Sequence, residues 1–151
     1  MVAVLIAAVA AVLVMWDEPQ EPQGGVATVA VVTLAAVTFR LEVADRSELW
    51  SRGLAGRAAV PENGGMIFVF PAAAPHAFWM KGMRVPIDIV WLRGQRLVSV
   101  TANVLPEPGK PDSLLTRYPS PGPVDTVIEL RAGRAAELGI HPGQEVSVVL
   151  P

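Results

Sequence analysis

Short runs of apolar residues, separated by Pro and Gly, make up most of the chain after residue 25. In Val37–Ala44 the apolar residues Phe39, Leu41 and Val43 alternate with polar ones, which is the period-two pattern of a half-buried strand. Similar alternating or wholly apolar runs predict strands over a set of short segments: Thr28–Leu34, Val37–Ala44, Met66–Phe70, His76–Met80, Ile87–Leu92, Gln95–Val104, Val124–Arg131 and Glu145–Leu150.

Two short helices are expected among these strands. Asp45 is a good N-cap residue with Glu48 three positions later, a capping-box pattern, and Gly53 should end that helix. A second helix is predicted over Ala132–Leu138, closed by Gly139. The fold class that follows is mainly β with two short helices, a β-rich α+β domain with a compact, mostly antiparallel sheet or barrel.

The connections carry their own signals. A two-residue turn at Ala35-Ala36 would join the first two strands, although such turns normally contain Gly or Asn. Pro71–Pro75 predicts a second turn. Leu105–Pro123 contains six prolines, so we expect a long loop that is too stiff for a helix and too broken for a strand.

The N-terminal segment Met1–Trp16 contains no polar side chain. As a helix it would span roughly 24 Å, short of the ~30 Å hydrocarbon core of a bilayer. No Lys or Arg precedes it and no small-residue cleavage site follows it, whereas Trp16 suits an interfacial position. We therefore favour an anchor helix. A cleaved signal peptide, a buried helix and a mis-assigned start codon stay open as alternatives.

The chain between this segment and the first strand, residues 17–25, is acidic, contains Pro and ends in Gly-Gly, which predicts a flexible linker. The first basic residue is Arg40, so the positive-inside rule gives no reason to hold this side in the cytoplasm. We expect one globular domain over residues 26–151. It would lie outside the cytoplasm, attached to the cell membrane by residues 1–16, or be exported after signal cleavage.

Composition narrows the function classes. The chain has no Cys, which excludes disulfides, thiolate zinc sites and Cys nucleophiles. The net charge is −2 and the bases form no stripe, so we expect no nucleic-acid partner. Gly-x-Ser-x-Gly, His-Glu-x-x-His and a phosphate-binding Gly loop are all missing from the sequence. No catalytic motif therefore points to an enzyme, and we expect neither a cofactor nor a bound metal.

Most of the side chains that could bind a ligand or take part in catalysis lie between Gly64 and Leu92. This segment holds three of the four Phe and two of the four Trp. Asp88 lies in an apolar strand, where a carboxylate needs a partner, and Lys81 and Arg84 are the nearest bases in sequence. Two interpretations stay open: an acid positioned beside Trp79, or a structural ion pair that fixes the strand register.

Other side chains in this region have a functional and a structural interpretation. Trp79 and Trp91 could form an aromatic platform for a sugar ring or a peptide, or they could be core residues. His76 and Met80, with a further Met, could bind copper(I), but Met beside aromatic rings is usually packing. Tyr118, the only Tyr, lies in the Pro-rich loop, which could line a binding groove or cover a sheet edge.

An ordered set of motifs resembles the uncharacterised bacterial and archaeal family called domain of unknown function 192. The motifs extend over about residues 37–150 and are Glu42-Val43-Ala44-Asp45, Arg52-Gly53-Leu54-x-x-Arg57, Gly65-Met66-Ile67-Phe68-Val69-Phe70-Pro71, Phe78-Trp79-Met80-Lys81, Pro86-Ile87-Asp88-Ile89, Val127-Ile128-Glu129-Leu130-x-Ala132-Gly133 and Gly139-Ile140-x-x-Gly143. The resemblance implies a small β-rich domain, commonly behind a signal or anchor, with no agreed activity. Two positions depart from the family pattern: Ala35-Ala36 replaces the Gly or Asn usual in the first turn, and Gly82 stands where many relatives carry Asn after the Lys.

From these observations we expect a binding or accessory domain outside the cytoplasm, whose ligand is envelope material or a protein. The candidate ligand-binding residues are His76, Trp79, Lys81, Arg84, Asp88 and Tyr118. The alternatives are a structural partner in a membrane complex and an envelope-acting enzyme that uses Asp88 as acid or base.

Overall fold

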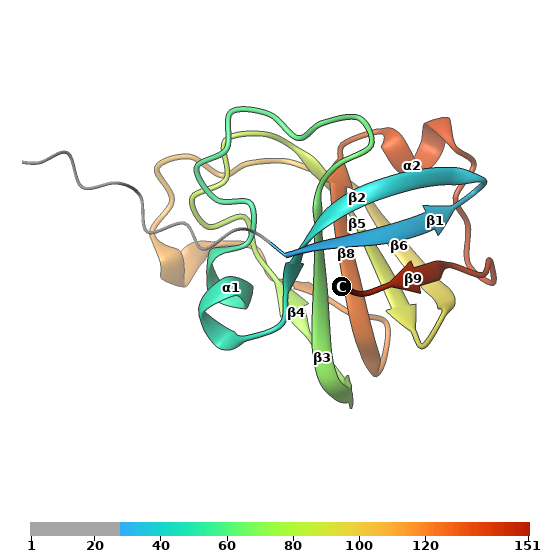
Figure 1. Cartoon of the computed structure of the whole chain (residues 1–151). Coiled ribbons are helices and arrows are strands. Elements are labelled where there is room, and N and C mark those ends of the chain that lie inside the picture. The colour runs from blue at the N-terminus through green and yellow to red at the C-terminus, as the bar shows by residue number, and fades with distance from the viewer. Residues whose placement is uncertain (1–27) are drawn as a thin grey trace, which may run out of the picture.

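A curled, seven-stranded sheet forms the body of the protein in a computed structural model that describes residues 28–151 (Figure 1). The strands follow one another across the sheet in the order β6-β5-β8-β3-β2-β1-β9. Their bounds are β1 Val29–Leu34, β2 Val37–Ala44, β3 Met66–Ala74, β5 Ile87–Arg93, β6 Arg96–Val104, β8 Val124–Arg131 and β9 Ser147–Val149. Only the β2–β3 pair within the described chain is parallel, so the prediction of a mainly β, mostly antiparallel fold is confirmed.

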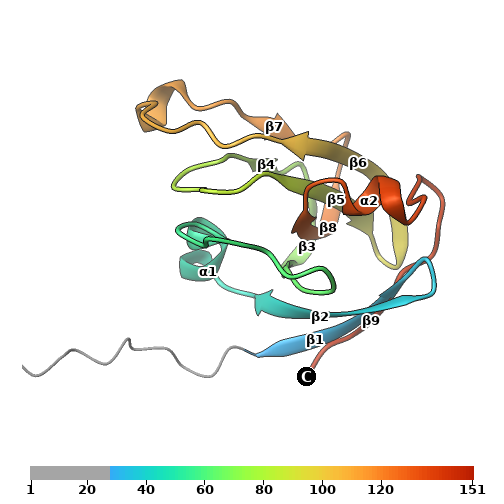
Figure 2. The ribbon, with the colours of Figure 1, turned by 90° about the horizontal axis from the view of Figure 1, so that it is seen from above.

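Three helical turns and a second, two-stranded sheet complete the described fold. The two-stranded sheet pairs β4, Ala77–Phe78, with β7, Tyr118–Pro119. The helices are α1, Ser47–Arg52, the 3₁₀ turn η1, Asp112–Leu114, and α2, Arg134–Glu137. Figure 2 shows α1 and α2 at opposite ends of the curled sheet, with β4 on the side of α1.

The two edges of the sheet meet at one end. Arg96 at the start of β6 forms a bridge with Glu145, just before β9. The backbone N–H of Leu97 donates to the carbonyl of Gln144 (2.9 Å), and that of Val146 donates to the carbonyl of Gln95 (2.8 Å). These bonds satisfy part of both sheet edges and make the sheet a half-barrel.

The central strands are buried on both faces, which explains why their sequences are apolar without alternation. In β5, Ile89 and Trp91 pack in one core, whereas Val90 and Leu92 pack in the other. The first core is covered by α1 and by segments that contribute Leu54, Val60, Met80 and Met83. The second core fills the curl between β1, β2, β5 and β8.

The β1–β2 turn confirms the predicted two-residue connection. Leu34 pairs with Val37, and the two residues between them, Ala35 and Ala36, have φ values of 49° and 62°. Both alanines therefore lie in the left-handed region that a type I′ hairpin turn needs and that Gly or Asn adopts more easily.

The predicted capping box at α1 is wrong. The helix begins one residue later, with Arg46 as an extended N-cap residue (φ −146°, ψ 160°) that makes no side-chain cap. The Asp45 carboxylate accepts instead from the Arg46 guanidinium at 3.2 Å. Gly53 ends the helix as predicted, with φ 49° and its N–H bound to the carbonyl of Leu49 (2.9 Å).

Two further boundaries differ from the prediction. The expected turn at Pro71–Pro75 is mostly strand, because β3 continues to Ala74 past a register shift after Val69. The expected strand His76–Met80 is only the two residues of β4, whose partner β7 lies inside the predicted Pro-rich loop. The bulge and the second sheet turn this part of the chain out of the main sheet.

The predicted anchor and linker, residues 1–25, lie outside the described residues. Within residues 28–151, no helix has both the length and the apolar character needed to cross a membrane.

Candidate functional site

A cleft of about 300 Å³ opens between α1 and the small β4–β7 sheet. Its lining residues come from α1, the middle of β3, β4 with the residues on either side of it, and the residue before β7. Figures 1 and 2 show how these elements are arranged. The lining residues, here called the aromatic cleft, are Ser47, Trp50, Ser51, Phe70, His76, Ala77, Phe78, Trp79 and Arg117. Four aromatic rings, two hydroxyls, one imidazole and one guanidinium thus face a shared space, a composition typical of small-ligand sites.

The rings are held by contacts outside the cleft. The indole N–H of Trp50 donates to the carbonyl of Ala44 at 2.9 Å, and its ring packs on Phe70 with centroids 5.0 Å apart. Phe78 packs edge-on against Phe68 at 4.8 Å and against Trp91 at 5.5 Å. Edge-to-face pairs of this kind add to simple burial, so the walls are fixed by the core beneath them.

His76 faces the cleft as an imidazole with unused hydrogen-bonding capacity. Its ring stacks on Phe70 with a centroid distance of 3.7 Å and an interplanar angle of 16°. Its backbone N–H donates to Ser120 Oγ (3.1 Å), and its carbonyl accepts from the Ser120 N–H (2.8 Å). The buried Nε2 atom has no hydrogen-bond partner among residues 28–151. Burial lowers the pKa of the ring, so His76 is a neutral donor or acceptor at neutral pH.

Two cations lie on Trp79 at the rim. The Arg117 guanidinium lies 3.6 Å from the centre of the indole ring, and Lys81 Nζ lies 5.5 Å from it. Lys81 also forms an ion pair with Asp112 of η1 at 2.5 Å. Trp79 therefore belongs to the cleft as predicted, whereas its partner in the platform hypothesis, Trp91, is fully buried and donates its N–H to Thr101 Oγ1 (2.9 Å).

A second and much smaller cavity adjoins the aromatic cleft. It measures about 20 Å³ and shares four residues with the cleft, namely Trp50, Ser51, Phe78 and Trp79. Its other lining residues are Arg52, Gly53, Leu54, Phe68, Lys81, Met83 and Glu129. We call this the Glu129 cavity.

Glu129 of β8 is the acidic group of this cavity, and only 4% of its surface is exposed. Its Oε2 atom finds no hydrogen-bond partner in the described part of the chain. Burial raises the pKa of the carboxyl to about 8, against a smaller opposite effect of the Leu54 backbone N–H. Glu129 is therefore mainly protonated at neutral pH, and it can donate as well as accept.

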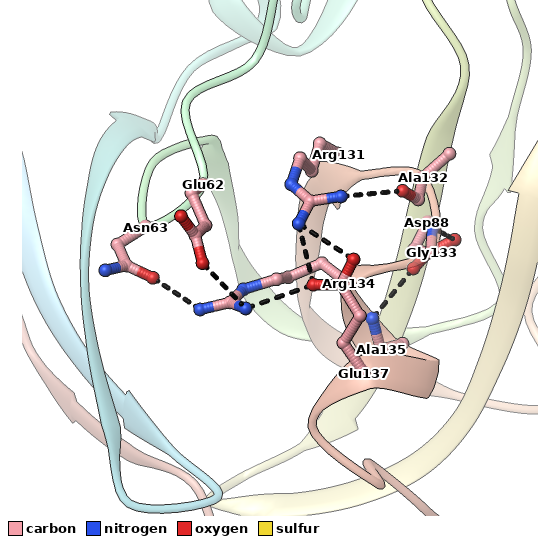
Figure 3. A network of polar contacts seen from close by, with 9 residues as sticks. All are labelled: Glu62, Asn63, Asp88, Arg131, Ala132, Gly133, Arg134, Ala135 and Glu137. Carbon is pink, nitrogen blue, oxygen red and sulfur yellow. Dashed lines mark hydrogen bonds and ion pairs between the residues drawn. The ribbon is translucent and has the colours of Figure 1, made fainter.

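Asp88, the acid singled out from the sequence, lies elsewhere. It is fully buried and accepts from three backbone N–H groups: Asn103 at 2.8 Å, Gly133 at 3.2 Å and Ala135 at 2.9 Å. Figure 3 shows Asp88 beside Gly133 and Ala135. The prediction that Lys81 or Arg84 pairs with Asp88 is therefore wrong. The backbone bonds tie β5 to β6 and to the start of α2, which is a structural arrangement.

A polar network beside Asp88 also joins segments far apart in sequence (Figure 3). The buried Arg134 of α2 donates to Asn63 Oδ1 (2.7 Å) and forms ion pairs with Glu62 (3.2 Å) and Glu137 (3.1 Å). Arg131 of β8 pairs with the same Glu137 at 2.6 Å. This network fastens the turn before β3 to α2, and it does not contribute to the aromatic cleft.

The remaining residues predicted from the sequence do not line the aromatic cleft. Arg84 is exposed and donates to the carbonyl of Gly56 (3.4 Å), outside both cavities. Tyr118 pairs with Phe78 across the small sheet and packs on the first core. Met80 and Met83 are buried in that core, which is the packing role weighed against copper binding.

The residues missed from the sequence are Trp50, Phe70, Phe78, Arg117 and Glu129. Glu129 lies within an apolar run, Val127–Leu130, just as Asp88 lies between two isoleucines. A carboxyl group in an apolar strand is therefore the sequence feature by which Glu129 could have been found. Arg117 carries no local signal, because only the fold brings it onto Trp79.

Two solved structures resemble this chain. One is a protein of unknown function from Novosphingobium aromaticivorans DSM 12444, with a TM-score of 0.72, 31% sequence identity, and coverage of 84% of this chain and 89% of that one. The other is a protein from Sinorhizobium meliloti 1021 described as a candidate transcription regulator, with a TM-score of 0.71, 25% identity, and coverage of 83% and 98%.

None of the curated proteins matches the chain. The model of one protein family, DUF192, described as Uncharacterized ACR, matches residues 30–148. That match includes all seven strands of the main sheet except the ends of β1 and β9, and it includes both cavities. The chain therefore belongs to the DUF192 family, a domain of unknown function.

Proposed function

We propose that this protein is a small-ligand binding module, held outside the cytoplasmic membrane by residues 1–16, and that its ligand occupies the aromatic cleft. The observation that carries the proposal is the cleft itself. It combines the Trp50, Phe70 and Trp79 rings with an unpartnered His76 Nε2 atom among the described residues. Apolar walls with a few convergent polar groups are the usual form of a ligand site.

The cleft favours a ligand that has both a ring and polar groups. Flat aromatic walls offer stacking area, while His76, Arg117 and the hydroxyls of Ser47 and Ser51 offer hydrogen bonds. The Arg117 guanidinium now covers one face of Trp79 and can keep a ligand's anionic group at the rim. Binding is favoured over catalysis because, within residues 28–151, no hydrogen bond links the Ser47 or Ser51 hydroxyl to the His76 ring.

The alternatives receive less support. The enzyme hypothesis relied on Asp88, whose two oxygens are occupied by three backbone N–H groups away from the cleft. The structural-partner hypothesis relied on the N-terminal segment, and the aromatic cleft gives it no added support. Nucleic acid is not part of the proposal, since several of the described bases are paired with acids: Arg57, Lys81, Lys110, Arg131 and Arg134.

A thermal-shift screen of the full-length chain tests the proposal. The panel would contain muropeptides, oligosaccharides, short peptides, and small aromatic acids and amines. A ligand at about 100 times its dissociation constant stabilises a fold by ~2.7 kcal/mol, which is readily measured. We expect the stabilisation to be lost in Trp79→Ala and Arg117→Ala.

The matched control is Arg93→Ala, which removes the same group from an exposed position at the end of β5, outside both cavities. Stabilisation that is equal in Arg117→Ala, Trp79→Ala and Arg93→Ala would place the ligand elsewhere. That result, or no hit in the panel, would count against a binding function of the cleft.

A further inference from the structure

The Glu129 cavity is a polar pocket that opens beside an otherwise aromatic cleft. Four residues line both spaces, so a ligand in the cleft lies next to the small cavity. Gly53 forms one side of the cavity, and a Cβ atom at this position would lie in van der Waals contact with Glu129 Oε2, 3.6 Å away. The volume of about 20 Å³ suits one group the size of a water molecule.

The oxygen of the buried Glu129 carboxyl that is unpaired among the described residues lowers the stability of the fold. A buried polar atom is normally hydrogen-bonded, and an unpaired one destabilises the fold. Glu129 Oε2 has no such bond within residues 28–151, although the neighbouring positions in β8, Ile128 and Leu130, show that the strand accommodates apolar side chains. In this part of the chain, one oxygen of the carboxyl is thus unpartnered at the cavity wall, which is a position that a polar group of a ligand can fill.

The charges around this carboxyl decide which partner fits. Arg52 and Lys81 also line the cavity, Lys81 being paired with Asp112 of η1, and the other described lining residues are uncharged. From β3, Met66 lies opposite Glu129, and Glu42 of β2 lies opposite Met66, where it is neutralised by Arg57. From β5 the facing residue is Ile89. The surroundings are thus apolar or positive, which favours an acidic group.

We propose that Glu129, in its protonated form, donates a hydrogen bond to a carboxylate oxygen of a ligand whose ring lies in the aromatic cleft. Arg52 supplies the balancing positive charge together with Lys81, whose charge is shared with Asp112. This inference rests on the proposed function and names its ligand class, a small ring-bearing carboxylic acid. It makes Glu129 a specificity-determining residue, because a ligand without an acceptor oxygen leaves the carboxyl unpaired.

The opposite assignment, an ammonium group bound by ionised Glu129, is disfavoured by the same surroundings. An ammonium in the cavity would meet Lys81 and Arg52 as like charges. The two assignments give opposite dependences on pH. A carboxylate ligand needs Glu129 protonated and binds best at low pH, whereas an ammonium needs it ionised and binds best at high pH.

The experiment measures binding of three matched probes, phenylacetate, phenylacetamide and phenethylamine, to the full-length chain by intrinsic Trp fluorescence. We expect phenylacetate to bind most tightly and its affinity to fall by roughly tenfold between pH 7 and pH 9, as Glu129 ionises. Glu129→Gln keeps an N–H donor, so it should retain binding and lose the pH dependence. Glu129→Met, of similar size without a donor, should bind at least tenfold more weakly.

Preferential binding of phenethylamine, strengthening with pH and lost in Glu129→Gln, would overturn the inference in favour of a cation site. Equal binding of all three probes by the wild type, Glu129→Gln and Glu129→Met would also overturn it, since the cavity would then hold only water. If that equal binding is lost in Trp79→Ala, the proposed function of the cleft stands without Glu129. Thermal unfolding of each variant alone verifies that it is folded.

Discussion

Two buried carboxylates with the same sequence signal are stabilised in different ways. Asp88 and Glu129 each interrupt an apolar run on neighbouring strands. Asp88 receives three backbone N–H groups, so its charge is compensated inside the fold. Glu129 has an unpartnered Oε2 atom among the described residues and a pKa raised to about 8. The sequence reveals a buried acid in both cases, but only the fold distinguishes the structural acid from the one that lines a cavity.

The raised pKa of Glu129 predicts a specific dependence of stability on pH. From pH 4.5, the ordinary value, to about pH 8, the unfolded chain has lost this proton while the folded chain retains it. The free energy of unfolding therefore falls with rising pH by up to about 1.4 kcal/mol per unit across this window, and levels off above it. Glu129→Gln should remove this fall and make the chain more stable at pH 8 by roughly 2–4 kcal/mol.

Chemical denaturation at a series of pH values measures this effect, and Glu48→Gln, the same change on an exposed side chain, is the control. His76 has a lowered pKa, so its contribution is lost as pH falls below about 6.5, in the opposite sense. That contribution is common to both proteins and cancels in the comparison. Parallel stability curves for the wild type and Glu129→Gln would contradict a buried, protonated Glu129.

Asp88→Asn should be destabilising by about 1–3 kcal/mol, because an amide NH₂ replaces one acceptor oxygen and faces backbone donors. The matched control is Asp45→Asn, at an exposed carboxylate whose only described side-chain bond is to Arg46. The midpoints of urea unfolding measure both changes. Equal, small shifts in the two variants would show that the three backbone bonds to Asp88 contribute little.

At the scale of elements, the strands were predictable because their side chains alternate or are uniformly apolar. The first hairpin, β5, β6 and β8 agree with prediction to within two residues. The errors arise where tertiary contacts override local pattern. Pro71 lies inside β3 because a register shift follows Val69, and β4 is short because its partner is β7, about 40 residues later in the chain.

The site itself was only half predictable. His76, Trp79 and Lys81 were selected because they lie beside aromatic residues, and they do line the two cavities. Trp50 and Arg117 come from α1 and the segment before β7, and no local pattern places them together with Trp79. Their meeting depends on the order of strands in the sheet, which the sequence pattern leaves undetermined.

The β1–β2 turn offers a test at this scale. Left-handed backbone costs an alanine about 1–2 kcal/mol, whereas Gly adopts it freely but loses more entropy on folding. Ala36→Gly should therefore stabilise the chain by roughly 0.5–1 kcal/mol. Thermal unfolding measures this, with Ala73→Gly as the control at an exposed strand position whose φ is not positive. Destabilisation by Ala36→Gly would contradict the type I′ geometry.

In the whole molecule, the half-barrel separates the structural network around α2 from the proposed ligand site. The Asp88 and Arg134 contacts fasten α2 at one end, and the aromatic cleft opens beside α1 at the other (Figures 2 and 3). The described chain begins at Thr28, just before β1, and the Thr28 carbonyl accepts from the Val43 N–H, near the end of β2 that leads into α1. The proposed tether would therefore join the domain on the side of the cleft.

The location outside the cytoplasm can be tested with a single engineered thiol, because the chain has no Cys of its own. Ser113→Cys places it on η1, where Ser113 is exposed. We expect a membrane-impermeant maleimide to label this protein in intact cells as fully as in lysed cells. Labelling only after lysis would contradict an extracytoplasmic domain, and a cytoplasmic thiol protein serves as the control for intact membranes.

A crystal structure with the strongest hit of the thermal-shift screen shows whether a ligand occupies the aromatic cleft. We expect a ring between Trp50 and Trp79, a polar atom within hydrogen-bond distance of His76 Nε2, and an oxygen in the Glu129 cavity. A ligand bound at any other surface, with the cleft filled only by water, would contradict it.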